Sequence, residues 1–151
     1  MSEQESPAEK PRPLRREAEA DRLLAHLRRE QRFLEESEKT LIDSGLDPAQ
    51  VRALFARRRA ELVALQGLPA EFRALKDRRR LPDPLVNLKG LGRALVQLRV
   101  RSGLSQRELA RRTGVHESQV SRDEKVGYGN ATIGRLQRVI EALDGRLVST
   151  W

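Results

Sequence analysis

Apolar residues recur with a helical period through the first third of the chain. From about residue 14 to residue 44 they form a heptad-like series that predicts one long helix, with members Ala20, Leu24, Leu27, Leu34 and Leu41. Gln31 and Glu38 interrupt this apolar seam. Gly45 follows the series, and a glycine at this point indicates the end of the helix.

A second helical series begins at Asp47 and Pro48, which suit the cap and the first position of a helix. Its apolar side is expected to contain Val51, Leu54, Phe55, Leu62 and Leu65. Gly67 is predicted to end this helix, and Pro69 to open a shorter one that reaches about Arg80. The short connection between the first two helices favours an antiparallel hairpin.

Breaks in the pattern divide the chain into four parts. Residues 1–13 are polar and rich in proline, so a disordered tail is expected. Residues 14–81 are predicted to form a helical module for dimerisation or partner binding. The segment LPDP ends it, and residues 82–87 are interpreted as a linker. Residues 88–151 form the second domain.

The second domain is predicted to be a compact helical bundle. Its first helix spans about residues 88–102 and ends at Gly103, and Thr132 caps its last helix. The inward-facing residues expected in these two helices are Leu91, Leu95, Leu98, Ile133, Leu136, Val139, Ile140 and Leu143.

Between these helices the pattern predicts two short helices joined by a tight turn. Ser105 and Glu108 have the spacing of a capping box, and Gly114 suits the left-handed residue that ends a helix. The next helix runs from about His116 to Asp123, with Val120 as its one large apolar anchor. Its outer face presents Glu117, Ser118, Gln119 and Arg122. Such a helix suits the major groove of DNA, and the pattern is that of a helix-turn-helix.

The segment LSQRELARRTGVHESQVSRDE, residues 104–124, resembles the Xre/Cro/cI family of helix-turn-helix regulators. The resemblance extends over about residues 88–143. It implies an all-α fold in which a lambda-repressor-like bundle follows the N-terminal hairpin, and it implies binding of double-stranded DNA.

The resemblance also implies roles for single residues. Glu117, Ser118 and Arg122 would face the bases, with Glu117 suited to a cytosine amino group and Arg122 to a guanine. Gln119 would contact a base or a phosphate, and Gln106 a phosphate. Further contacts with the DNA backbone are expected from Lys125, Tyr128, Asn130 and Thr132.

Three positions depart from the family pattern. Asp123 stands where many members have an apolar residue, and we expect it to pair with an arginine or to shift the following loop. That loop, Lys125 to Asn130, is about one residue longer than the common form. His116 replaces the usual serine or threonine at the helix cap, where it caps the helix or lies near the phosphates.

Composition agrees with a nucleic-acid partner and gives little support to catalysis. Residues 88–151 hold 12 basic and 6 acidic residues, whereas the preceding part holds 18 and 16. A basic domain attracts phosphates, although a solvated arginine-rich surface explains the charge alone equally well. The two histidines lie in different segments and no phosphate loop is present. No enzymatic activity, metal or cofactor is therefore expected.

The last six residues, RLVSTW, alternate between apolar and polar positions as a short β-strand does. A lone strand needs a partner, and the symmetric solution is the same strand of a second copy. We therefore predict a homodimer held by Leu147, Val148 and Trp151 on an inverted-repeat operator. The alternative is a frayed tail with Trp151 tucked against the bundle.

These observations favour a soluble, cytoplasmic, sequence-specific transcriptional regulator. Its small size and extra helical module suggest an antitoxin-like repressor of its own operon, with a partner protein such as a toxin on the module. The competing hypothesis is a protein-interaction module in which DNA binding is secondary. A phage-type repressor that senses a small ligand lacks an obvious ligand-binding domain. No run of apolar residues approaches the roughly 18 that a membrane span needs.

Overall fold

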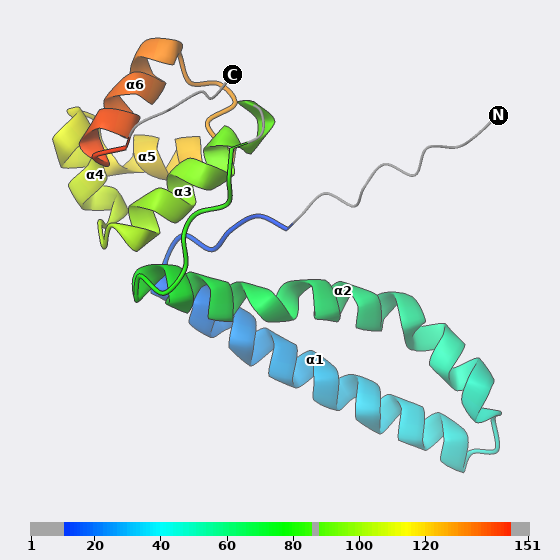
Figure 1. The fold of residues 1–151 in the computed structure, drawn as a ribbon. Coiled ribbons are helices and arrows are strands. Elements are labelled where there is room, and N and C mark those ends of the chain that lie inside the picture. Colours follow the sequence, from blue (N-terminus) through cyan, green and yellow to red (C-terminus); the bar gives the residue numbers. More distant parts are fainter. Residues whose placement is uncertain (1–10, 86–87, 146–151) are drawn as a thin grey trace, which may run out of the picture.

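The computed structural model describes residues 11–85 and 88–145, and every regular element in these ranges is a helix. A long hairpin projects from a compact bundle (Figure 1). The hairpin consists of α1 (Glu17–Asp43) and α2 (Pro48–Lys76). The bundle consists of the short 3-10 helix η1 (Leu88–Gly90), α3 (Leu91–Arg101), α4 (Gln106–Thr113), α5 (Glu117–Lys125) and α6 (Ile133–Ala142). The all-α prediction is confirmed, and the proposed C-terminal strand lies outside the described residues.

The turn of the hairpin forms as its sequence predicts. Gly45 adopts a φ of 97°, a left-handed conformation that glycine tolerates without steric cost. The carboxylate of Asp47 then accepts hydrogen bonds from the backbone N–H groups of Ala49 and Gln50, both at 3.0 Å. These bonds satisfy free donors at the start of α2, and α2 runs back along α1 (Figure 1).

The outer part of the hairpin has a small core that is reinforced by charge. A buried cluster contains Leu27, Leu34 and Leu62. Arg58 of α2 pairs with Glu30 of α1 at 2.5 Å, and Arg59 pairs with Glu38. The prediction for Leu54 is wrong, because this residue is 69% exposed. The hairpin therefore leaves apolar surface uncovered.

Helix α2 continues through the point where the sequence predicted a break. Gly67 does not end it, and Pro69 lies inside it rather than opening a new helix. A proline within a helix costs about 3 kcal/mol, because it removes a hydrogen bond and crowds the preceding turn. Here Leu68, Phe72 and Leu75 are buried around Pro69. Each buried large side chain contributes about 1.5–3 kcal/mol, which offsets that cost.

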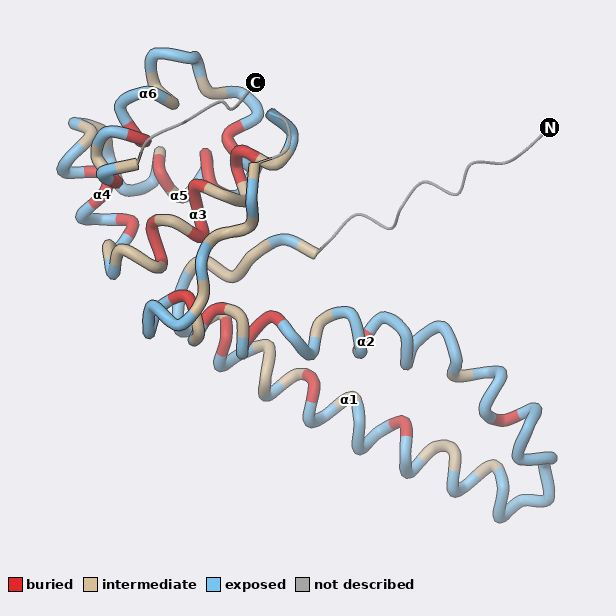
Figure 2. Tube along the Cα trace, in the orientation of Figure 1, coloured by how far each residue is buried: buried red, intermediate tan, exposed pale blue. Residues whose placement is uncertain are grey.

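The base of the hairpin packs on the bundle. Ala20 of α1, Phe72 and Leu75 of α2 and Val100 of α3 form one buried cluster. The buried positions of the hairpin are densest at this end (Figure 2). The fully buried amide of Gln97 adds polar bonds to the same junction. It accepts from the Asp83 N–H and donates to Glu71, both at 2.7 Å.

The bundle core agrees with most of the apolar pattern. Its buried members are Leu91, Leu95, Val96, Leu109, Ala110, Val120, Tyr128, Val139, Ile140 and Leu143. Leu98 and Leu136 pack against this core at its edge. The prediction for Ile133 is wrong, since it is 85% exposed in the first turn of α6. Within the described ranges, no helix is long and apolar enough to cross a membrane.

Candidate nucleic-acid interface

The turn between α4 and α5 is fixed by local hydrogen bonds. The Ser105 hydroxyl accepts from the Glu108 N–H at 3.1 Å, and the Glu108 carboxylate accepts from the Ser105 N–H at 2.7 Å. The Glu108 carboxylate also accepts from the Ser105 hydroxyl at 2.8 Å. The hydrogen bonds that it accepts from the Ser105 N–H and hydroxyl lower the pKa of the Glu108 carboxyl. Gly114 ends α4 with a φ of 71°. The predicted capping box and left-handed glycine are confirmed.

Helix α5 begins at the cap that the sequence proposed. Nδ1 of His116 accepts from the Ser118 N–H at 3.2 Å, so histidine takes the capping role here. Val120 is only 3% exposed and anchors the helix in the bundle core. The His116 cap therefore fixes where α5 begins, and the buried Val120 fixes which side of α5 faces solvent.

A buried ion pair holds the far end of α5 against α3. Arg99 donates to the Glu124 carboxylate through two nitrogens, one of them at 2.9 Å. The Arg99 and Glu124 side chains are 3% and 0% exposed. Removing one partner of such a pair leaves the other charge buried and unpaired, which typically destabilises a fold by about 3–5 kcal/mol. Sequence reasoning missed this pair, although an arginine in an otherwise apolar helix face was a signal for it.

The outer face of α5 presents polar groups to solvent. Glu117, Ser118 and Arg122 are exposed, and Ser118 and Arg122 lie one helical turn apart. The guanidinium of Arg122 donates to the side-chain oxygen of Gln119 at 3.1 Å. Among the described residues, no carboxylate forms a salt bridge with Arg122. Its remaining donors are therefore available to an external acceptor.

Asp123 connects α5 to α6. It is 7% exposed, and it accepts from the Gln119 side-chain amide at 2.8 Å and from Arg135 at 3.3 Å. The expected pairing with an arginine is therefore present. Gln119 donates to Asp123 and accepts from Arg122, so its amide is held by one neighbour on each side.

Two residues predicted to contact phosphates lie inside the protein. Gln106 is 3% exposed; it donates to Glu124 at 2.6 Å and accepts from Arg16 at 2.7 Å. Tyr128 is 4% exposed, belongs to the bundle core and has a φ of 59°. Burial and the nearby Glu124 charge raise the pKa of its hydroxyl. Neither side chain lies on the protein surface, so neither belongs to the candidate interface.

The other residues that are predicted to contact the DNA backbone come after α5 and lie on the protein surface. Lys125, Asn130 and Thr132 are exposed. The Thr132 hydroxyl also accepts from the Arg135 N–H at 3.3 Å and so caps α6. The Tyr128 N–H donates to the Asp123 carbonyl at 2.7 Å, and this hydrogen bond ties the loop that carries these residues to the end of α5.

A family model described as a helix-turn-helix domain matches residues 90–145. These residues form a helix-turn-helix domain. The match spans α3 to α6 and supports a DNA-binding regulator, while the hairpin lies outside it. No curated protein and no solved structure matches the chain. Within the described ranges, no group of three or more acidic or histidine side chains is placed to hold a metal ion.

Proposed function

We propose that this protein is a sequence-specific transcriptional regulator that binds operator DNA as a homodimer and represses its own operon. The observation that carries the proposal is the exposed face of α5 in the helix-turn-helix domain. Arg122 and Ser118 lie there without a described ionic partner, on a helix whose opposite side is buried. A helix presented in this way suits the major groove.

The chemistry of this face indicates how bases would be distinguished. Arg122 can donate two hydrogen bonds to O6 and N7 of a guanine, and Glu117 can accept from the amino group of a cytosine. Ser118 between them can donate or accept. Lys125, Asn130 and Thr132 would bind the DNA backbone beyond the end of α5. Gln119 is better placed to hold Arg122 than to read a base.

A dimer follows from the size of the reading surface. One α5 helix covers only a few base pairs, so a specific site needs two copies on an inverted repeat. Their half-site centres would lie about 34 Å apart, one turn of duplex, or a multiple of this spacing. We propose that the C-terminal strand with Leu147, Val148 and Trp151 joins the copies. The hairpin is the alternative interface.

Selection from a library of random duplexes tests this function. We expect enrichment of an inverted repeat with a guanine in each half-site. Deleting residues 146–151 should shift the protein toward a monomer and weaken operator binding steeply, whereas binding to an unrelated duplex should fall less. A library that shows no enriched sequence would contradict the proposal. A truncated protein that stays dimeric would transfer the dimer interface to the hairpin.

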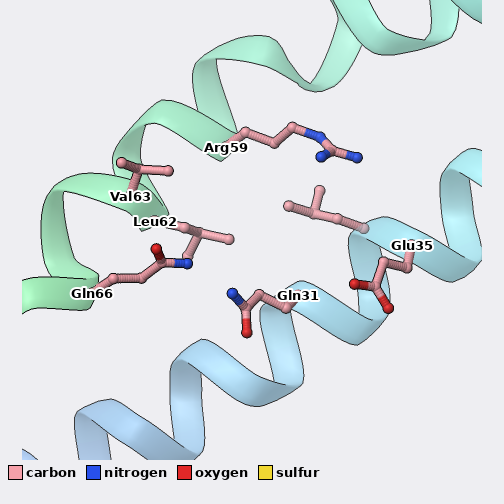
Figure 3. Close-up of a pocket in the computed structure, with 7 residues that line it drawn as sticks. Gln31, Glu35, Arg59, Leu62, Val63 and Gln66 are labelled. Carbon is pink, nitrogen blue, oxygen red and sulfur yellow. The ribbon is translucent and has the colours of Figure 1, made fainter.

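A second candidate function is partner binding by the hairpin, as an antitoxin-like regulator would require. Phe33, Leu54 and Val63 are each more than 60% exposed on its helices. A hollow of about 140 Å³ lies between α1 and α2, and its lining includes Gln31 and Glu35 of α1 and Leu62, Val63 and Gln66 of α2 (Figure 3). The three exposed apolar side chains on the hairpin favour a protein partner for this surface. Co-purification with the product of an adjacent gene, lost on Leu54→Asp, tests this role.

A further inference from the structure

A short arm, residues 11–16, crosses from the hairpin to the helix-turn-helix domain. In Figure 1 it is the blue stretch that leads into α1 beneath the bundle. Arg12 donates to the Lys125 carbonyl at 2.6 Å, and Arg15 donates to the Ser121 carbonyl at 3.2 Å. Arg16 reaches Gln106 at 2.7 Å and the Ser121 hydroxyl at 3.4 Å. The arm therefore lies along α5 and over the start of α4.

The arm borders the face of α5 that is proposed to enter the groove. Ser121 and Lys125 form one row along the helix, and Ser118 and Arg122 form the adjacent row. An α-helix is about 10–12 Å wide and the major groove about 12 Å wide. A helix in the groove is thus flanked closely by the two sugar–phosphate backbones. Groups that lie beside α5 would meet phosphates.

The arginines of the arm differ in whether they form an ion pair with a carboxylate. Arg15 forms an ion pair with Glu19 at 2.8 Å, and its carbonyl accepts from Arg99, so it has a structural role. Arg12 and Arg16 are exposed and form no salt bridge with any carboxylate in the described ranges. Each guanidinium carries five N–H donors. Arg12 uses one of them toward Lys125, and Arg16 uses three toward Gln106 and Ser121.

Arg16 also covers the residue that the sequence assigned to a phosphate. Gln106 is the first residue of α4, where free backbone N–H groups favour an anion. Its side chain is occupied by Glu124 and Arg16. The exposed positive charge above this helix start therefore belongs to Arg16.

We propose that the arm is part of the DNA-binding surface and that Arg12 and Arg16 bind backbone phosphates of the duplex. This inference rests on the proposed function and adds a phosphate contact from outside the matched domain. Because α1 continues directly from the arm, the hairpin fixes the position of these two charges. DNA affinity then depends on residues that a fragment of residues 90–145 lacks.

The salt dependence of DNA binding by the full chain tests the arm directly. Arg12→Gln/Arg16→Gln removes two charges while keeping hydrogen-bonding groups toward Lys125 and Gln106. Each lost phosphate contact should lower the slope of log affinity against log salt by about 0.9. We expect the slope to be smaller by about 1.8 for each bound protomer, and therefore by about 3.6 for a bound dimer, on the selected operator and on an unrelated duplex alike. The matched control, Arg22→Gln/Arg29→Gln, removes two charges from exposed positions of α1 and should leave the slope unchanged.

The possible outcomes separate the two proposals. A wild-type protein that binds no duplex would overturn the proposed function. If the wild-type protein binds DNA and the arm variant has an unchanged slope, the proposal for the arm is wrong, even if the affinity falls. The proposed function then still stands. The single variant Arg12→Gln gives half the change in slope and disturbs only an exposed contact. Arg16→Lys keeps the charge and should retain the wild-type slope if phosphate binding is its role.

Discussion

The carboxylate of Asp123 lies 2.8 Å from the side-chain amide nitrogen of Gln119, one turn earlier on the same helix. The other end of that amide accepts from Arg122, and Arg135 of α6 donates to Asp123. A chain of side chains thus runs from α6 to the proposed base-reading arginine. The buried acid orients Gln119, and Gln119 restrains Arg122.

Asp123→Asn should reduce base discrimination more than overall DNA affinity. The neutral amide loses the ion pair with Arg135 and holds Gln119 less firmly. A net loss of about 0.5–1.5 kcal/mol, the range for one hydrogen bond, is expected at the base pair that Arg122 contacts. Gel-shift titration on duplexes with single base changes measures it. Glu141→Gln makes the same charge change at an exposed position of α6 and should leave discrimination intact.

Gly92→Ala should strongly destabilise the bundle. A Cβ atom at Gly92 would lie 2.0 Å from the carbonyl oxygen of Gly127, so α3 and the loop after α5 would have to separate. At Gly134 in α6, the corresponding Cβ position has no neighbour within 4 Å other than its own stretch of helix backbone. Gly134→Ala should therefore be neutral or stabilise by up to about 1 kcal/mol. Urea unfolding of both variants checks this, and equal stabilities would refute the close approach.

Asp83 should contribute to stability in a pH-dependent way. Burial alone would raise its pKa, but hydrogen bonds from Arg93 and Arg80 lower it from 3.8 to about 2. A carboxyl with a depressed pKa stabilises the fold above its unfolded pKa, and this stabilisation is lost as the pH falls from about 4 to about 2.

Asp83→Asn should consequently lower the free energy of unfolding by about 2 kcal/mol near neutral pH, from 1.36 kcal/mol per pKa unit. The difference from wild type should largely vanish near pH 2. Asp77→Asn, at a 53%-exposed carboxylate paired with Arg79, should change stability little at either pH. Denaturant titrations at several pH values give the comparison. A wild-type advantage that persists near pH 2 would contradict the role of the Asp83 charge.

Phe72 and Phe33 offer a matched test of the joint between hairpin and bundle. Phe72 is 6% exposed and packs with Val100 of α3, whereas Phe33 is 61% exposed. Phe72→Ala should cost about 3–5 kcal/mol, and Phe33→Ala should stay within about 0.5 kcal/mol of wild type. A fragment that begins at residue 85 should also be less stable than the full chain. Similar effects for the two phenylalanines would mean that the hairpin does not pack on α3.

Local sequence signals predicted several helix ends correctly, although Gly67 does not end a helix. Gly45, Asp47, Ser105 and Gly114 each act through their own backbone or near neighbours, so residue type and spacing were sufficient. Pro69 was misjudged because its environment is made by Phe72, Leu75 and α3, which local rules do not include.

The candidate site was predicted where it depends on the exposed face of one helix. Glu117, Ser118 and Arg122 follow from the period of α5 and its single anchor. The burial of Gln106 and Tyr128 depends on partners far away in the sequence, namely Arg16 for Gln106 and the bundle core for Tyr128. The contacts of the arm span about a hundred residues, and no spacing rule reaches that distance.

Base readout by Arg122 is the central claim, and one comparison tests it most directly. Arg122→Ala and Arg138→Ala remove an exposed arginine from α5 and α6, respectively. Both are titrated against the selected operator and a panel of single base changes. Arg122→Ala should lose about 1–3 kcal/mol per half-site of the operator, together with the preference at one base pair in each half-site, whereas Arg138→Ala should keep the wild-type preference. An Arg122→Ala protein that retains every base preference would contradict the account.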